Sequence, residues 1–121
     1  MRTLILLLAL AGLFAFLLAN KIPDNCLRIE GSTTVSIKDD SFSPNPLTIK
    51  KCTKVIFKND SSRSAWPASD LHPTHGIYPE FDPKEGYSPG KSWSFIFNRI
   101  GKWPYHDHLN PSTHGKIIVN P

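Results

Sequence analysis

Apolar and polar residues alternate with a period of two along much of this chain. Successive side chains of an extended strand point to opposite faces, so this period predicts half-buried strands. No window shows the 3.6-residue period of a long amphipathic helix. We predict strands in six segments: residues 35–37, 47–49, 55–57, 93–97, 103–105 and 117–119.

Proline- and glycine-rich turns separate these strands. They include Ser43–Pro46, Ser88–Gly90 and Asn98–Gly101. Short strands with turns at this spacing predict an all-β sandwich or barrel. The stretch from Asp60 to Gly90 is too long for a simple connection, and loops of that length in a compact domain are often functional.

The first 19 residues have a different composition. Arg2 precedes an uncharged apolar run from Thr3 to Ala19, the pattern of an export signal or a membrane anchor. The run is at the short limit of the roughly 17–25 apolar residues that cross a bilayer. Leu17 is a poor residue three positions before a cut after Ala19, so we favour an uncleaved anchor over a cleaved signal.

The chain therefore divides into three parts: a signal peptide or anchor (1–19), a linker (20–31) and one domain (32–121). The whole chain has 14 basic and 10 acidic residues, a net charge of +4. The basic residues are scattered along the sequence and form no block, which favours a solvated surface over nucleic-acid binding. We expect a membrane to be contacted through the N-terminal segment.

Cys26 and Cys52 are the two cysteines of the chain. An even number in an exported protein suggests a disulfide, with free buried thiols as the alternative. Such a bridge would contribute roughly 3 kcal/mol by restricting the unfolded chain. Neither cysteine is next to a histidine, which argues against a role as metal ligand.

Histidines form two tight clusters outside the predicted strand centres. His72 and His75 lie in the long loop, and His106 and His108 lie where the 103–105 strand ends, with His114 a few residues later. Imidazole suits copper, zinc, nickel and iron. Two such clusters predict a metal site of three or four imidazoles, although isolated histidines are usually surface residues and His114 is the weakest candidate.

Two longer motifs resemble the cupredoxin superfamily, which includes plastocyanin- and azurin-like domains. Residues 35–59 (VSIKDDSFSPNPLTIKKCTKVIFKN) are similar to the first half of such a domain, with Cys52 where a glycine is usual. Residues 89–98 (PGKSWSFIFN), 101–108 (GKWPYHDH) and 115–119 (GKIIV) resemble its closing hairpin.

The resemblance implies a Greek-key β-sandwich of seven or eight strands with a copper site at the end that holds the loops. It places His75 or His72 as the first histidine ligand and His106 near the position of the usual cysteine ligand. Asp107 is a candidate to orient an imidazole from behind, as carboxylates often do; Asp82 and Glu80 are weaker candidates.

This sequence departs from the blue-copper pattern, which requires a cysteine thiolate, two histidines and a weak axial ligand. The hairpin has no cysteine, and Met1 is the only methionine. We therefore expect a copper site of nitrogen and oxygen ligands, tetragonal as Cu(II), that zinc could also occupy.

Three functions remain open at this point. The first is a copper carrier, buffer or delivery protein outside the cytoplasm, in the periplasm or at the cell surface, with an unidentified protein as donor or acceptor of the metal. The second is a redox protein, either an electron carrier or an oligomer similar to multicopper oxidases, whose Trp-Tyr-His-x-His segment resembles residues 103–108. The third is a metal-free interaction domain. No motif for hydrolysis or nucleotide use is present, and we predict no enzymatic activity.

Overall fold

The computed structural model describes residues 21–121. The predicted signal or anchor (1–19) lies outside the described residues. No helix among residues 21–121 has the length and apolar character needed to cross a membrane.

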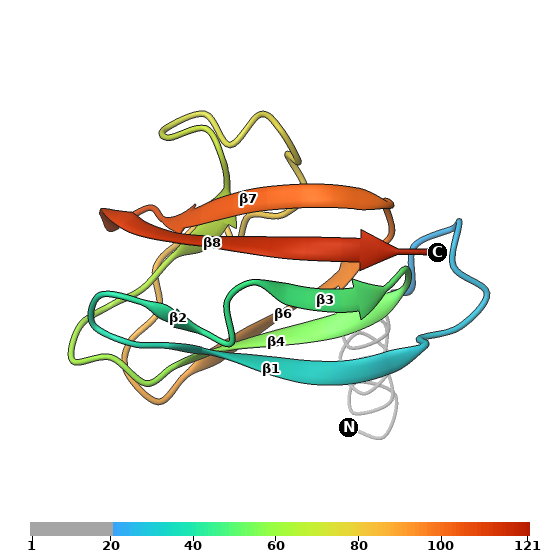
Figure 1. Ribbon diagram of the computed structural model, residues 1–121. Helices are drawn as coiled ribbons and strands as arrows, with labels where there is room; N and C mark the ends of the chain where they lie inside the picture. Colours follow the sequence, from blue (N-terminus) through green and yellow to red (C-terminus); the bar gives the residue numbers. More distant parts are fainter. Residues whose placement is uncertain (1–20) are drawn as a thin grey trace, which may run out of the picture.

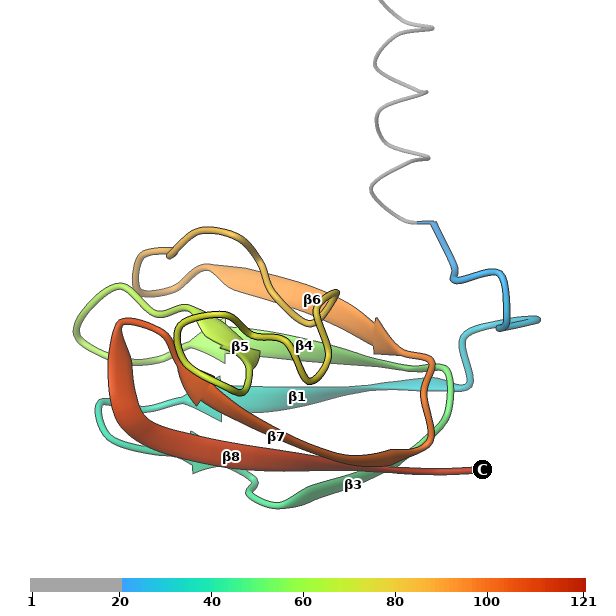
Figure 2. The same cartoon turned by 90° about the horizontal axis from the view of Figure 1, so that it is seen from above.

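Eight strands form two four-stranded sheets that pack face to face (Figures 1 and 2). One sheet has the order β2-β1-β4-β6 and the other has the order β3-β8-β7-β5. The strands are β1 (Gly31–Ile37), β2 (Phe42–Ser43), β3 (Leu47–Lys50), β4 (Thr53–Asn59), β5 (Pro67–Ser69), β6 (Ser92–Phe97), β7 (Gly101–Asp107) and β8 (Asn110–Asn120).

All six predicted strand segments are confirmed, and the expected number of seven or eight strands is met. The short strands β2 and β5 were not predicted. β5 lies inside the stretch 60–90, which we had treated as irregular throughout. β8 begins at Asn110, before the predicted segment 117–119, so His114 lies in a strand.

The two sheets are held together by a core rich in aromatic rings. Phe57 of β4 and Tyr105 of β7 come from opposite sheets and contact each other edge to face, with ring centroids 5.7 Å apart. Gly115 lies directly opposite Tyr105 in the β7–β8 pair. A Cβ atom at Gly115 would come within 2.4 Å of the Tyr105 ring, so only glycine fits there.

The linker is fastened to one end of the sandwich. Cys26 and Cys52 form the predicted disulfide, and the side chains of Asn25 and Asn98 are joined by a hydrogen bond of 2.9 Å. β1 begins at Gly31, one residue before the expected start of the domain. The end of β7 and the loop that follows β5 lie at the opposite end (Figure 1).

Candidate metal centre

The loop between β5 and β6 is held against the sandwich by two buried aromatic side chains. Tyr78 and Phe81 are both fully buried, and the Phe81 ring packs on Phe57 and Tyr105 of the core. The backbone N–H of Ser69, the last residue of β5, donates to the Phe81 carbonyl at 2.9 Å. These contacts fix the position of the segment between them, which carries His72 and His75.

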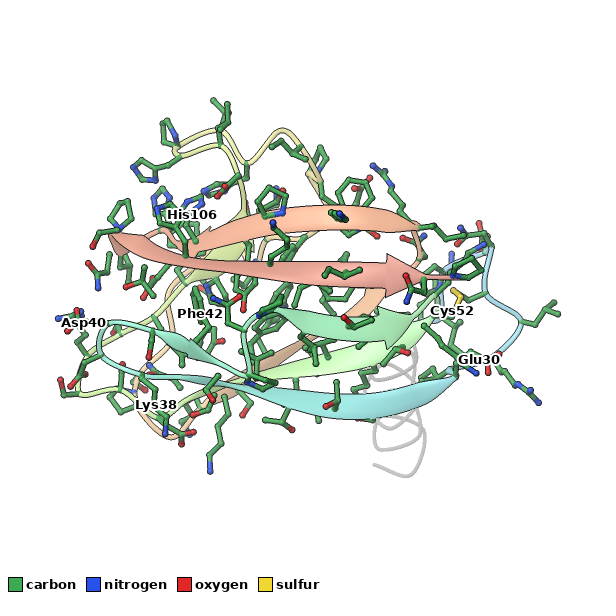
Figure 3. All side chains as sticks on the ribbon, viewed as in Figure 1. Glu30, Lys38, Asp40, Phe42, Cys52 and His106 are labelled. Carbon is green, nitrogen blue, oxygen red and sulfur yellow. A yellow bond between two sulfur atoms is a disulfide. The ribbon has the colours of Figure 1, made fainter. Side chains whose placement is uncertain are left out.

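The second pair of histidines comes from the end of β7. Tyr105 points into the core, so the next residue, His106, points to the other face of its sheet. Figure 3 shows His106 above β7 and β8, on the side away from β1 and β4. The loop covers this face, and His106 is therefore only 1% exposed.

Four histidines meet where the loop crosses the end of β7. One ring nitrogen from each lies within 4.8 Å of those of the other three. His75 and His106 are buried, His108 is half-buried and His72 is exposed. The structure thus brings together the four histidines that the sequence predicted as ligands: His72, His75, His106 and His108.

His106 has one ring nitrogen fixed and the other free. Its Nδ1 atom lies 2.6 Å from Oδ1 of Asp70. A carboxylate accepts hydrogen bonds, so this contact places the imidazole proton on Nδ1 and leaves a lone pair on Nε2. In residues 21–121, Nε2 of His106 is the one buried side-chain nitrogen or oxygen atom without a hydrogen-bond partner. Buried polar atoms are nearly always paired, so this nitrogen indicates a missing partner.

His75 is oriented in the same way by a second carboxylate. Its Nδ1 atom lies 2.8 Å from Oδ2 of Asp82, and its Nε2 atom lies 3.1 Å from Nδ1 of His108. The carboxylate again favours the proton on Nδ1. The lone pair on Nε2 of His75 therefore points toward the other imidazoles.

Asp82 also links this histidine to Trp66. Its Oδ1 atom accepts a 2.8 Å hydrogen bond from the indole Nε1 of Trp66. The Trp66 ring in turn packs on His108, with ring centroids 4.3 Å apart. Trp66 and Asp82 thus hold His75 and His108 from the side away from the cluster.

The electrostatics favour the neutral form of two of the four imidazoles, those of His106 and His108. Burial lowers the pKa of His106, and the His75 and His72 rings lower it further, against the effect of Asp70. Burial and the same two neighbouring rings lower the pKa of His108. Burial would raise the pKa of Asp82, but the hydrogen bonds that it accepts, first from His75, lower it overall. Neutral imidazoles beside ionised carboxylates are the state in which histidine binds metal.

Asp107 has a different place from the one we expected. Its Oδ1 atom accepts hydrogen bonds of 3.0 Å from the backbone N–H groups of Trp66 and Leu109, and it closes the turn after β7. The carboxylates that contact imidazoles are Asp70 and Asp82. Asp82 was a weak candidate from the sequence. Asp70 was not predicted, because its role follows only from the pairing of β5 with β7, which brings it beside His106.

The remaining candidates lie outside the cluster. His114 is exposed on β8, where it pairs with His106 across the strands, but it is not part of the four-histidine group. Glu80 forms an ion pair with Arg99, with an N–O distance of 3.0 Å. Both cysteines are consumed by the disulfide at the far end of the domain, so no thiolate is available.

The donor set fits a metal ion. Four imidazoles converge, two of them are oriented by carboxylates, and a buried nitrogen lone pair has no protein partner. A carboxylate that fixes a histidine tautomer from behind is the usual arrangement around metal-bound histidine. Imidazole ligands without a thiolate match the nitrogen-rich site expected from the sequence.

Comparisons with known proteins agree with this fold. A family model described as "Cupredoxin-like domain" matches residues 6–119. The chain therefore belongs to the cupredoxin-like family. A search among curated protein sequences finds no match.

Solved cupredoxin structures share this fold. A purple cupredoxin from Nitrosopumilus maritimus is 21% identical, with a TM-score of 0.64 over 73% of this chain and 99% of that one. A reduced tryptophan-to-tyrosine variant of amicyanin is 20% identical, with a TM-score of 0.64 over 83% of this chain and 97% of that one. A methionine-to-alanine variant of amicyanin in the Cu(I) form is 19% identical, with a TM-score of 0.63 over 84% and 89% of the two chains.

Proposed function

We propose that this protein binds one copper ion through His72, His75, His106 and His108, and that it carries, buffers or delivers copper outside the cytoplasm. The observation that carries the proposal is the buried, unpaired Nε2 atom of His106, which belongs to a group of four converging histidines. A metal partner is supported by the cupredoxin fold, and one structural neighbour is described as a Cu(I) form.

The ligand set favours holding copper over passing electrons. A thiolate ligand is a defining part of blue-copper electron-transfer sites, and this chain has none free. Bound copper would supply a Lewis-acidic, redox-capable centre. The protein supplies two oriented imidazoles, and two carboxylates whose negative charges offset the charge of a divalent ion.

Exchange of the metal requires a ligand that an incoming partner can reach. His72 is exposed and its ring packs against His106, with centroids 5.2 Å apart. We propose that His72 is the ligand from which copper enters and leaves, while buried His106 and His75 hold it. The disulfide supports a location in an oxidising compartment such as the periplasm or the cell surface.

The test is a titration of the purified, oxidised chain with Cu(II), followed by EPR and visible absorption. We expect one equivalent to bind with a weak visible band and a tetragonal spectrum. His106→Ala should lower the affinity by more than about 100-fold, beyond the loss usual for an outer-shell partner, whereas the matched control His114→Ala should leave it unchanged.

Other outcomes separate the remaining functions. Absence of stoichiometric copper binding would support a metal-free interaction domain, and preference for Zn(II) in competition would assign the site to zinc. Rapid, reversible reduction of the bound copper would favour the electron carrier instead. An intense thiolate band would contradict the ligand set.

A further inference from the structure

The linker end of the molecule combines features that point to a second surface. Residues 21–30 are tied to the domain by the Cys26–Cys52 disulfide and by the Asn25–Asn98 hydrogen bond. Figure 3 shows Cys52 and Glu30 at the end of the molecule opposite His106. The loop is therefore held in one place on the domain, and side chains at its tip have fixed neighbours.

Leu27 lies at this tip and is fully exposed, and Ile29 is also exposed. A single exposed leucine is ordinary. Here the leucine is next to Arg28 in a loop that the disulfide holds in place. Exposing an apolar side chain to water is unfavourable, so a fixed, exposed leucine suggests a surface that it contacts. Apolar tips flanked by basic residues are typical of surfaces that lie on a membrane.

Basic residues surround the tip on both sides. Arg28, Lys50 and Lys51 line one hollow together with Leu27. Lys21 and Lys54 line another together with Ile29. The folding of the chain thus gathers basic residues that the sequence scatters.

The acidic groups at this end are fewer. They are Asp24 and Glu30 on the linker and Glu80 beside the Asn98–Gly101 turn, where it forms an ion pair with Arg99. Glu30 accepts from Nε of Arg28 at 3.3 Å, and Asp24 lies 3.9 Å from Nζ of Lys21. Lys50, Lys51 and Lys54 form no ion pair among the described residues, so their charges are available to anionic groups.

We propose that this linker face (Lys21, Leu27, Arg28, Ile29, Lys50, Lys51 and Lys54) rests on the surface of an anionic lipid bilayer, with Leu27 at the level of the headgroups. The apolar run that ends at Ala19 directly precedes it in the sequence, which places the face beside a membrane if the run is retained. Lysine and arginine next to a membrane segment are attracted by anionic lipids. The inference does not depend on copper binding.

This arrangement orients the domain. Cys52 and Glu30 at the linker face and His106 of the histidine group lie at opposite ends of the sandwich (Figure 3). A domain that rests on its linker face presents His72 and His108 to the aqueous side, where a protein partner can approach.

The test uses the full chain with Leu27→Trp, reconstituted into vesicles of equal parts phosphatidylcholine and phosphatidylglycerol that carry bromine on the acyl chains. Bromine quenches an indole that reaches the lipid. We expect a loss of roughly half of the emission of the introduced indole, because the tip reaches the headgroup and acyl boundary. The matched control is Leu109→Trp, which alters an exposed leucine beside His108.

A charge-reversal pair tests the electrostatic part. Lys50→Glu with Lys51→Glu should abolish the quenching of the Leu27→Trp chain, whereas Lys91→Glu with Lys116→Glu should leave it unchanged. Equal quenching of the two tryptophan variants, quenching that is the same in purely phosphatidylcholine vesicles, or failure of the chain to float with the vesicles would each overturn the proposal.

Discussion

The two ends of this sandwich are stabilised in opposite ways. At the linker end, a disulfide and an asparagine pair fasten the chain to the domain. At the histidine end, buried imidazoles and carboxylates converge, and one buried nitrogen has no partner. A covalent bond stabilises the first end whatever is bound, whereas the second end keeps a buried nitrogen, Nε2 of His106, without a protein partner.

The comparison shows that the features expected to stabilise the fold and those expected to bind a ligand lie at different ends of the domain. Unpaired buried polar groups cost free energy and persist where they serve a purpose. The two ends are joined by an apolar, aromatic core and by Asn98, which accepts a hydrogen bond from the Tyr78 hydroxyl and donates one to Asn25. Neither contact of Asn98 includes a histidine, so we expect changes at the two ends to act separately. Substitutions far apart with no shared partners usually have additive effects.

The largest effect on stability is expected from removing the disulfide. Cys26→Ser with Cys52→Ser should lower the free energy of unfolding by about 3 kcal/mol, because the unfolded chain is no longer restricted. Copper affinity should not change, since the bridge lies at the far end. Chemical denaturation and a Cu(II) titration measure the two quantities. A loss of copper affinity in the folded variant would show that the ends are coupled.

A smaller effect, confined to the histidine end, is expected from the carboxylates. Asp70→Asn keeps the shape of the side chain but removes its charge and its preference for the Nδ1 proton of His106. We expect Cu(II) affinity to fall about 10- to 100-fold, as for other outer partners of metal ligands. Cu(I) affinity should fall less, because a monovalent ion is stabilised less by the lost negative charge.

Competition titrations with Cu(II) and Cu(I) chelators measure both affinities. Asp40→Asn is the matched control, because that carboxylate is 88% exposed, pairs with Arg63 and lies apart from His106 in Figure 3. A fall of equal size for the two oxidation states would point to a purely structural role for Asp70.

The smallest effect is the pH dependence of the metal-free protein. The folded state lowers the pKa of His106 and His108 below the ordinary value of 6.5. As pH falls through about 6.5, the unfolded chain binds protons that the folded protein does not, so stability must decrease. The lowered pKa of Asp82 has the same sign near pH 4: its contribution is present above the ordinary value of 3.8 and is lost below it.

Melting temperatures of the metal-free chain between about pH 8 and pH 5 check this expectation. We expect a decrease toward acid that is reduced in the double variant His106→Gln with His108→Gln. The Cys26→Ser with Cys52→Ser variant should keep the full slope. A pH-independent melting temperature would contradict neutral, buried imidazoles.

Much of the fold was predictable because its signals are local. Alternation of apolar and polar residues identified six strands, including the one that ends in His106. The short strands β2 and β5 were not predicted, because two or three residues are too few to show an alternating pattern. The disulfide was favoured by two cysteines in a chain with an export-like segment, since only one pair can form, and the structure excludes the alternative of free thiols.

The candidate site was half predictable. Residue type and spacing were enough to identify His72, His75, His106 and His108 as a group, because imidazoles are rare enough that two clusters stand out. The position of Asp107 between two histidines also predicted that its carboxylate would orient an imidazole, and that prediction was wrong. Its carboxylate accepts backbone N–H groups instead, and Asp70 and Asp82 have the role expected of it.

By itself, the sequence determined the six longer strands and the absence of a cysteine from the closing hairpin, and it predicted a histidine ligand set, because each depends on residue type and nearest neighbours. Only the tertiary structure decided which residues meet. Because Tyr78 and Phe81 are buried in the core, the loop lies over the end of β7. This position brings His72 and His75 of the loop next to His106 and His108. Contacts between segments so far apart depend on how the whole chain packs, and no local pattern records them.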